Sequence, residues 1–196
     1  ILHCPQNKYM RDMKVKAKIL SDKDLNRTIV RLAHQIIEKN KGAENICIVG
    51  MRTRGEFIAR RIAAEINKIE NHDLKIGVLD TTLYRDDYRQ KLRTPVAHVT
   101  DIPFGIDGKN IILVDDVLYT GRSVRAALDA IMDFGRPASI QLVVLIDRGH
   151  RELPIQADLI GESVITSIGE EVRVRLSEVD SADEVLLIDV NNDETE

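Results

Sequence analysis

One stretch, Ile111–Ser123, constrains the fold of this chain more than any other. Four consecutive aliphatic residues, Ile111–Val114, predict a strand buried on both faces, and therefore a central strand of a parallel sheet. Two carboxylates, Asp115 and Asp116, follow at its carboxyl end, where open α/β sheets bind their ligands. A short loop, Thr120–Ser123, leads into a predicted helix whose apolar residues recur at helical spacing: Val124, Ala127, Leu128 and Ile131.

This order of strand, acid pair, loop and helix start predicts an anion site. The free N–H groups and the positive end of the helix favour a phosphate. Asp115 and Asp116 cannot hold that phosphate because like charges repel, but they suit vicinal hydroxyls or a hard metal such as magnesium. A ligand with a phosphate at one end and a diol nearby is a ribose phosphate.

The rest of the chain alternates apolar runs with helical patterns, which indicates an α/β domain. Ser21 and Asp24 indicate the start of a helix that runs to about Asn40. A second helix is predicted after Gly55. Further strands are predicted at 46–49, 74–78, 140–146 and 158–161, and an antiparallel, half-exposed pair at 172–176 and 185–190.

The charge balance excludes a globally basic nucleic-acid binder. The 28 Lys and Arg against 32 Asp and Glu give a net charge of −4, so an RNA site would have to be a local patch. No apolar run approaches the length of a membrane span. Cys4 and Cys47 are neither paired in sequence nor at metal-binding spacing, so we expect a reduced, cytoplasmic protein.

A second polar turn, Gly50–Glu56, joins a predicted strand to a helix. Glu56 stands where a nucleotide-binding loop needs its lysine, so this is not a Walker loop. Two glycines that admit the backbone and two arginines that supply forked donors still suit a pyrophosphate. The long polar stretch from Arg85 to about Thr100 is typical of a lid.

The Ile111–Ser123 stretch resembles the phosphoribosyl pyrophosphate (PRPP) signature of type I phosphoribosyltransferases. Leu83–Asp87 and Asp147–Ile155 narrow the resemblance to the bifunctional pyrimidine-operon attenuation regulators and uracil phosphoribosyltransferases, over about residues 16–190. This resemblance implies the type I α/β fold, with a central, mostly parallel sheet flanked by helices and a small hood around 147–178. We expect residues 1–16 to form an arm, 17–190 a single domain and 191–196 a polar tail.

The resemblance also implies a reaction, in which uracil and PRPP give UMP and pyrophosphate. Asp115 and Asp116 would bind the ribose diol, with Mg²⁺ held through the ligand rather than by a direct protein cluster. Thr53 and Arg54 would bind the pyrophosphate, which Arg85 would reach as the lid closes. The expected phosphate and ribose site continues through Val117, Leu118, Tyr119, Thr120, Gly121, Arg122 and Ser123, and the expected uracil hood comprises Ile146, Asp147, Arg148 and Ile155.

Tyr119 bears on the choice of base. Hypoxanthine-guanine enzymes carry an aspartate at this position, placed to exchange a proton with the purine. A phenol with an ordinary pKa of about 10 is a poor substitute for that carboxylate. Purine salvage is therefore the weaker assignment.

A second activity follows from the same resemblance: UMP- or UTP-dependent binding of pyrimidine-operon leader RNA by a homodimer or higher homo-oligomer. Where regulatory members carry lysines, over 161–172, this chain has Glu162, Ile168, Glu170 and Glu171. Two alternatives therefore stay open: a salvage-only enzyme, for uracil or for a purine or orotate, and a non-catalytic RNA regulator. The candidate RNA contacts are Arg31, His34, Lys39, Arg148 and Arg151.

Overall fold

The computed structural model describes residues 14–81, 84 and 100–190. The chain divides into two compact units, one formed by residues 26–165 and the other by the segments up to Leu25 and from Thr166 onward. The expected hood at 147–178 therefore contributes to both units. Arg85 and nearly all of the expected lid lie outside the described residues.

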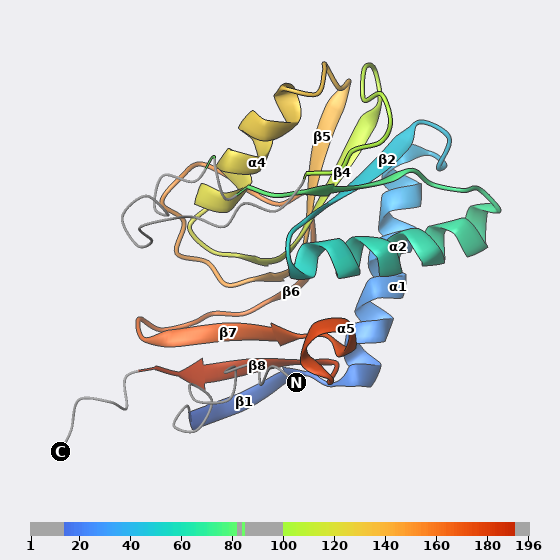
Figure 1. Cartoon of the computed structure of the whole chain (residues 1–196). Helices are drawn as coiled ribbons and strands as arrows, with labels where there is room; N and C mark the ends of the chain where they lie inside the picture. Colours follow the sequence, from blue (N-terminus) through green and yellow to red (C-terminus); the bar gives the residue numbers. More distant parts are fainter. Residues whose placement is uncertain (1–13, 82–83, 85–99, 191–196) are drawn as a thin grey trace, which may run out of the picture. The chain divides into compact units, whose positions relative to one another are not determined.

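The larger unit is built on a five-stranded parallel sheet with the order β3-β2-β4-β5-β6 (Figure 1). Its central strand, β4, contains the four aliphatic residues that predicted it, and all four are fully buried. The predicted α/β class with a central parallel sheet is thus confirmed. The strands are β2 (Ile46–Met51), β3 (Ile76–Leu79), β4 (Asn110–Leu118), β5 (Ser139–Asp147) and β6 (Leu159–Ser163).

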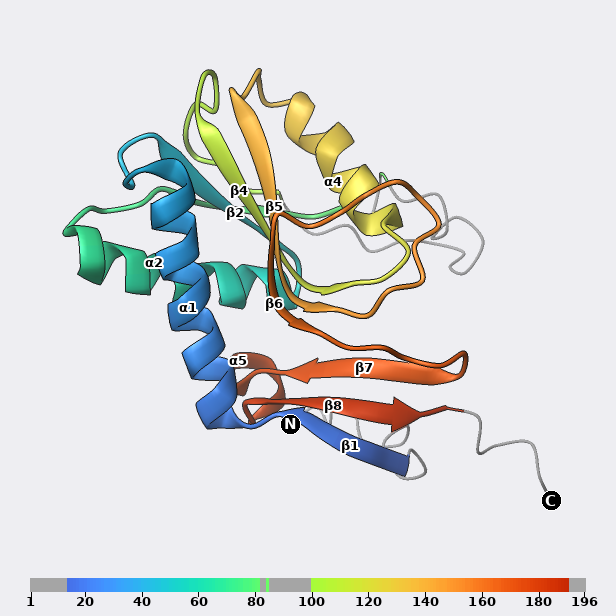
Figure 2. The ribbon, with the colours of Figure 1, turned by 180° about the vertical axis from the view of Figure 1, so that it is seen from behind.

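Helices cover both faces of this sheet. Figure 2 shows α4 (Arg122–Met132) on one face and α1 (Asp22–Asn40) and α2 (Arg54–Glu70) on the other. The capping signal at the start of α1 is real, because the Ser21 hydroxyl donates to Asp24 Oδ2 at 2.6 Å and accepts the Asp24 N–H at 3.4 Å. Each helix buries an apolar stripe, and together these stripes enclose the strands.

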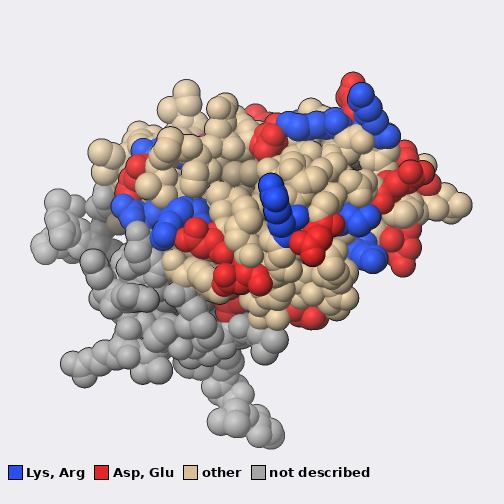
Figure 3. Space-filling model, turned by 90° about the horizontal axis from the view of Figure 1, so that it is seen from above, with Lys and Arg blue, Asp and Glu red and all other residues tan. Residues whose placement is uncertain are grey.

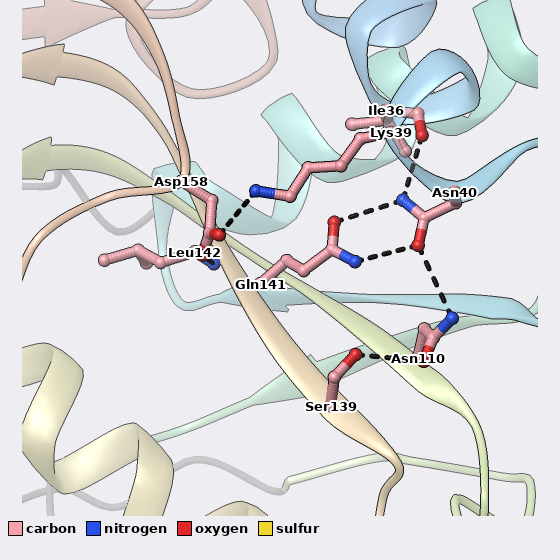
Figure 4. A network of polar contacts seen from close by, with 8 residues as sticks. All are labelled: Ile36, Lys39, Asn40, Asn110, Ser139, Gln141, Leu142 and Asp158. Atoms are coloured by element: carbon pink, nitrogen blue, oxygen red, sulfur yellow. Dashed lines mark hydrogen bonds and ion pairs between the residues drawn. The ribbon is translucent and has the colours of Figure 1, made fainter.

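A polar network fixes the end of α1 near the amino ends of β4 and β5 (Figure 4). The side-chain amides of Asn40 and Gln141 exchange two hydrogen bonds, at 3.1 and 2.8 Å. Asn110 donates to Asn40 at 3.5 Å and accepts from Ser139 at 2.9 Å. Because these partly buried polar groups satisfy one another's hydrogen bonds, we interpret the network as a structural one that holds α1 against β4 and β5.

The smaller unit carries a three-stranded antiparallel sheet with the order β1-β8-β7. The strands are β1 (Lys14–Leu20), β7 (Glu170–Arg175) and β8 (Glu184–Asp189), and the short helix α5 (Ser177–Asp180) joins the last two. The predicted antiparallel pair is confirmed as β7 and β8. β1 was not predicted and begins inside the expected N-terminal arm, although lysine alternates with apolar residues from Lys14 to Ile19.

Most strand boundaries differ slightly from the sequence expectation, and the contacts explain two of these differences. The strand predicted at 74–78 begins only at Ile76, because Leu74 is a buried loop residue whose N–H donates to Asn67 Oδ1 at 3.0 Å. β4 continues through both aspartates to Leu118, since its pairing with β5 extends to Asp147. Within the described ranges, no helix combines the length and the hydrophobicity needed to cross a bilayer.

Candidate active site

The strand order locates the site. β2 lies between β3 and β4. The chain therefore leaves the carboxyl end of β2 toward β3 and the carboxyl end of β4 toward β5, in opposite directions along the sheet. Such a switch point is where open α/β sheets form a ligand crevice. The Arg52–Gly55 turn follows β2, and the acid pair lies near the end of β4. The turn after β2 and the acid pair of β4, both predicted as ligand-binding motifs, therefore lie at the same edge of the sheet.

The two carboxylates are oriented by their own backbone. Asp115 Oδ1 accepts the N–H of Asp116, and Asp116 Oδ1 accepts the N–H of Val117, both at 2.9 Å. Asp115 is buried at 9% exposure, whereas Asp116 is half-buried. Side chains alternate along a strand, so the two acids leave β4 on opposite faces.

Gly55 brings the turn after β2 against β4. A Cβ atom on Gly55 would lie 2.6 Å from the Val114 carbonyl oxygen and 3.1 Å from Asp115 Cα. Only glycine allows the backbone of α2 to approach this closely. The approach holds Thr53, which is exposed, and Arg54, which is half-buried, beside the acid pair. The peptide bond that precedes Thr53 is cis.

The loop after β4 forms a pocket at the amino end of α4. Gly121 caps the helix with a φ of 92°, in the left-handed region that favours glycine. The first N–H groups of a helix have no acceptor inside the helix, so they can bind an anion. The pocket has a volume of about 410 Å³ and is lined by Asp115, Val117, Leu118, Tyr119, Thr120, Gly121, Arg122, Ser123, Val124 and Glu152.

The Asp147–Ile155 segment after β5 is fastened to this loop. The Arg148 N–H donates to the Leu118 carbonyl at 3.1 Å, and Ile155 Cβ lies 3.3 Å from the place that a Cβ on Gly121 would occupy. The Arg151 guanidinium binds Asp147 Oδ2 at 2.5 Å. It also donates to four carbonyl oxygens, those of Leu118, Tyr119, Gly149 and Ile155. The predicted hood residues thus lie next to the predicted phosphate loop.

Tyr119 is the one aromatic side chain among the described residues that line the pocket, and it is 44% exposed. The Arg148 guanidinium lies 4.1 Å from the centre of its ring, and the His150 ring meets it edge-on at 6.1 Å. The stacked guanidinium holds the phenol as a flat wall. His150 itself has a φ of 56°, which is uncommon for a residue with a side chain.

The candidate RNA contacts are dispersed. Arg31 and His34 are exposed on α1, and the Arg31 guanidinium donates to the Gly161 carbonyl. Lys39 pairs with Asp158 at 2.7 Å, and Arg151 binds Asp147 together with carbonyl oxygens of its own segment and of Leu118 and Tyr119. On the face seen in Figure 3, blue and red side chains are interspersed over the described surface.

The residues present are compatible with a magnesium ion that arrives with its ligand. No group of three or more His, Cys, Asp and Glu side chains among the described residues could hold a metal ion by itself. Mg²⁺ is usually bound by one or two carboxylates together with substrate phosphates. Asp115, which lines the pocket, or Asp116 could provide such a carboxylate.

Two contributions to the site were missed by sequence reasoning. Glu152 lines the pocket and binds Arg122, with Oε2 at 2.6 Å from Nε. Gly55 was interpreted as a point of ligand approach, yet its close neighbour is β4. Both depend on contacts between segments far apart in the sequence, and no local pattern signals them.

Comparison with known proteins gives a consistent result. Residues 17–178 match the model of the phosphoribosyl transferase domain. The bifunctional protein PyrR of Pelotomaculum thermopropionicum is 54% identical over 174 residues, which cover 89% of this chain and 96% of that protein. The bifunctional protein PyrR of Deinococcus deserti is 51% identical over 177 residues, covering 90% and 97%.

Solved structures agree on the fold. A hypoxanthine-guanine phosphoribosyltransferase of Bacillus anthracis superposes with a TM-score of 0.68 at 20% identity, over 88% of this chain and 98% of that one. The hypoxanthine phosphoribosyltransferase of Trypanosoma cruzi in complex with IMP gives 0.68 at 14% identity, over 89% and 94%. The expected membership is confirmed: the chain belongs to the phosphoribosyl transferase family and, within it, to the bifunctional PyrR proteins.

Proposed function

We propose that this protein transfers the phosphoribosyl group of PRPP to uracil, giving UMP and pyrophosphate. One observation carries the proposal. An acid pair suited to a diol lies between two elements whose chemistry suits anions, the Arg52–Gly55 turn and the loop that starts α4. PRPP has the matching order, since its ribose hydroxyls lie between a 5′-phosphate and a 1-pyrophosphate. The PyrR relatives support the same assignment.

The ribose and its 5′-phosphate would bind at the end of β4. N–H groups from Thr120 to Ser123, together with the two hydroxyls, would bind the phosphate, and Arg122 adds a positive charge. Asp115 and Asp116 would accept hydrogen bonds from the ribose hydroxyls. As the bond from C1 to pyrophosphate breaks, the ring becomes cationic, and the acid pair stabilises that charge.

The leaving pyrophosphate would bind at the turn after β2. Thr53 and Arg54 offer a hydroxyl and a forked cation there, and Arg85, outside the described residues, is proposed as a further cation. Magnesium, which phosphoribosyltransferases generally use with PRPP, would neutralise part of the leaving group's charge and bind through the ligand beside Asp115 or Asp116.

The base would lie beside the Asp147–Ile155 segment. The fold neighbours are purine enzymes, but at 14–20% identity they indicate the fold alone. Tyr119 stands where those enzymes are expected to have an aspartate, and the stacked Arg148 supports it as a wall. Because Tyr119 offers an aromatic surface and no carboxylate that could exchange a proton with a purine, we expect the site to prefer uracil over hypoxanthine.

A panel of bases tests this assignment. Initial rates with PRPP and magnesium should be highest with uracil and at least tenfold lower with orotate and with hypoxanthine. A preference for orotate or hypoxanthine would overturn the choice of base while leaving the PRPP site intact. Absence of pyrophosphate release with every base would instead favour the non-catalytic regulator.

For the second activity, we propose that UMP or UTP promotes binding of pyrimidine-operon leader RNA. The support is the family membership and the exposed Arg31 and His34 on α1. The acidic Glu162 and the exposed Ile168 stand where regulatory members have lysines, so we expect weaker binding than in those members. Nucleotides and a nascent transcript meet in the cytoplasm, so we expect the protein to act there, as a homo-oligomer.

Filter binding of leader RNA with and without UMP tests this activity. His34→Ala should weaken UMP-dependent binding and leave uracil turnover unchanged, whereas His72→Ala, in the loop after α2, should affect neither. Arg31 is a less clean test, because its loss would also break the contact with the Gly161 carbonyl. No binding at low salt with saturating UMP would leave a salvage-only enzyme.

A further inference from the structure

The pocket at the start of α4 contains an acid that the phosphate site does not need. Glu152 lines it, and its carboxylate binds Arg122, with Oε2 at 2.6 Å from Nε. The Arg122 side chain is 35% exposed and that of Glu152 50% exposed, so the pair lies at the pocket mouth. A ligand phosphate bound to this loop would meet a negative charge next to its own cation.

The backbone fixes Glu152 in this position. Its N–H donates to the Thr120 carbonyl at 3.0 Å, and the N–H of Leu153 donates to the same oxygen at 3.2 Å. The preceding residue, Arg151, donates to the carbonyl of Tyr119 at 2.7 Å. Glu152 is thus attached to the residue just before Gly121, so its carboxylate belongs to the built pocket rather than to a free surface loop.

We propose that Glu152 is an internal competitor for the ligand phosphate at Arg122. A phosphate that binds the loop must either share the guanidinium with Glu152 or displace the carboxylate, and in both cases it is repelled by the remaining charge. The competition limits the affinity for phosphorylated ligands. In an enzyme that must release a nucleotide product, such a limit shortens the time for which the product stays bound.

The proposal rests on the assigned phosphate loop and adds a role that opposes binding. Removing the charge of Glu152 should therefore tighten binding, which is unusual for a change at a residue that lines a site. At this partly exposed position, solvent screens the repulsion. We expect a three- to tenfold gain, roughly the effect of one unit charge at about 6 Å in a water-rich setting.

Calorimetric titration of Glu152→Gln tests the proposal, with Asp129→Asn as the matched control. Asp129 pairs with Arg125 on the same helix at 2.9 Å, and its loss changes the net charge equally outside the pocket. Ribose 5-phosphate and UMP are the phosphorylated probes, and uridine is the probe without phosphate. Glu152→Gln should lower the Kd of both phosphorylated probes three- to tenfold and leave that of uridine unchanged. Asp129→Asn should change none of the three.

Unchanged or weaker binding of ribose 5-phosphate to Glu152→Gln would overturn the proposal, and so would an equal gain for uridine. The gain should shrink when Arg122→Gln is added, because the competition for the guanidinium is then lost and only the screened repulsion between Glu152 and the phosphate remains. A chain that uses another base would fail to bind UMP but would still show the gain with ribose 5-phosphate. Failure of the uracil assignment is thereby distinguished from failure of this proposal.

Discussion

Gly55→Ala directly tests the close approach between the turn after β2 and the acid strand. The new methyl group would lie 2.6 Å from the Val114 carbonyl oxygen, whereas Cβ atoms in proteins essentially never come within 3.0 Å of such an atom. Both partners are backbone, so no flexible side chain can yield. The start of α2 or the end of β4 must therefore move by at least about 0.4 Å.

This displacement sets the expected magnitudes. Overpacking of this kind costs about 1–3 kcal/mol, which corresponds to a fall in Tm of about 2–12 °C for a protein of this size. The turn also moves relative to Asp115, so kcat/KM for PRPP should fall about 10- to 100-fold. Thermal unfolding and initial rates well below Tm measure the two effects. Gly105→Ala is the control, because a Cβ at Gly105 meets no atom of the described residues within 4 Å.

Wild-type stability and activity in Gly55→Ala would refute the packing between α2 and β4. A lowered Tm with unchanged kinetics would show that the contact matters for the fold but that the position of the turn does not affect catalysis. A matching loss in Gly105→Ala would mean that both effects are unspecific.

Three further predictions concern single residues. Arg54→Ala should weaken pyrophosphate binding about tenfold and UMP binding less than about twofold in calorimetry; equal losses would make Arg54 a structural residue. The pKa of Glu184 is lowered, chiefly by its hydrogen bond to Lys18. The Glu184 carboxylate therefore stabilises the fold at pH values above the ordinary carboxyl pKa of about 4.3, and this stabilisation is lost as the pH falls through the lowered pKa. Glu184→Gln should therefore cost about 0.5–1 kcal/mol at pH 7 and less than that at pH 3 in denaturant titrations, and an equal cost at both pH values would contradict this. Burial raises the pKa of Cys47, so its thiol in the folded protein should resist alkylation at pH 8. Peptide mapping after treatment with an alkylating reagent measures this, and rapid modification of Cys47 would mean that β2 is not buried.

The sheet could be predicted because its signals are local. The apolar runs of β2, β4 and β5 lie on buried strands, and such runs favour a strand over a helix when they are short and turn residues bound them. The start of α1 could likewise be predicted from the capping signal of Ser21 and Asp24. By contrast, Leu74 is apolar and buried but lies in a loop, so burial alone suggested a strand that begins too early.

The parts that could not be predicted depend on tertiary contacts. β1 pairs with β8, which lies more than 160 residues away in sequence, and its exposed lysines gave no sign of a core. Glu152 was visible as a polar residue, but its pairing with Arg122 depends on how two loops meet. Glu170 belongs to the stretch where regulatory members carry lysines, yet it is buried, binds Lys16 and accepts the Ser167 N–H at 2.6 Å.

The central claim is that the acid pair of β4 supports phosphoribosyl transfer to uracil. The most direct measurement follows labelled uracil with PRPP and magnesium, in wild type and in Asp116→Asn, with Tm recorded for both. Wild type should form UMP and pyrophosphate in equal amounts, and Asp116→Asn should fold normally and be slower by about 100- to 1,000-fold, because an amide supplies no charge to the cationic ribose. A wild-type protein that forms no UMP, or an Asp116→Asn variant with near wild-type turnover, would contradict the account.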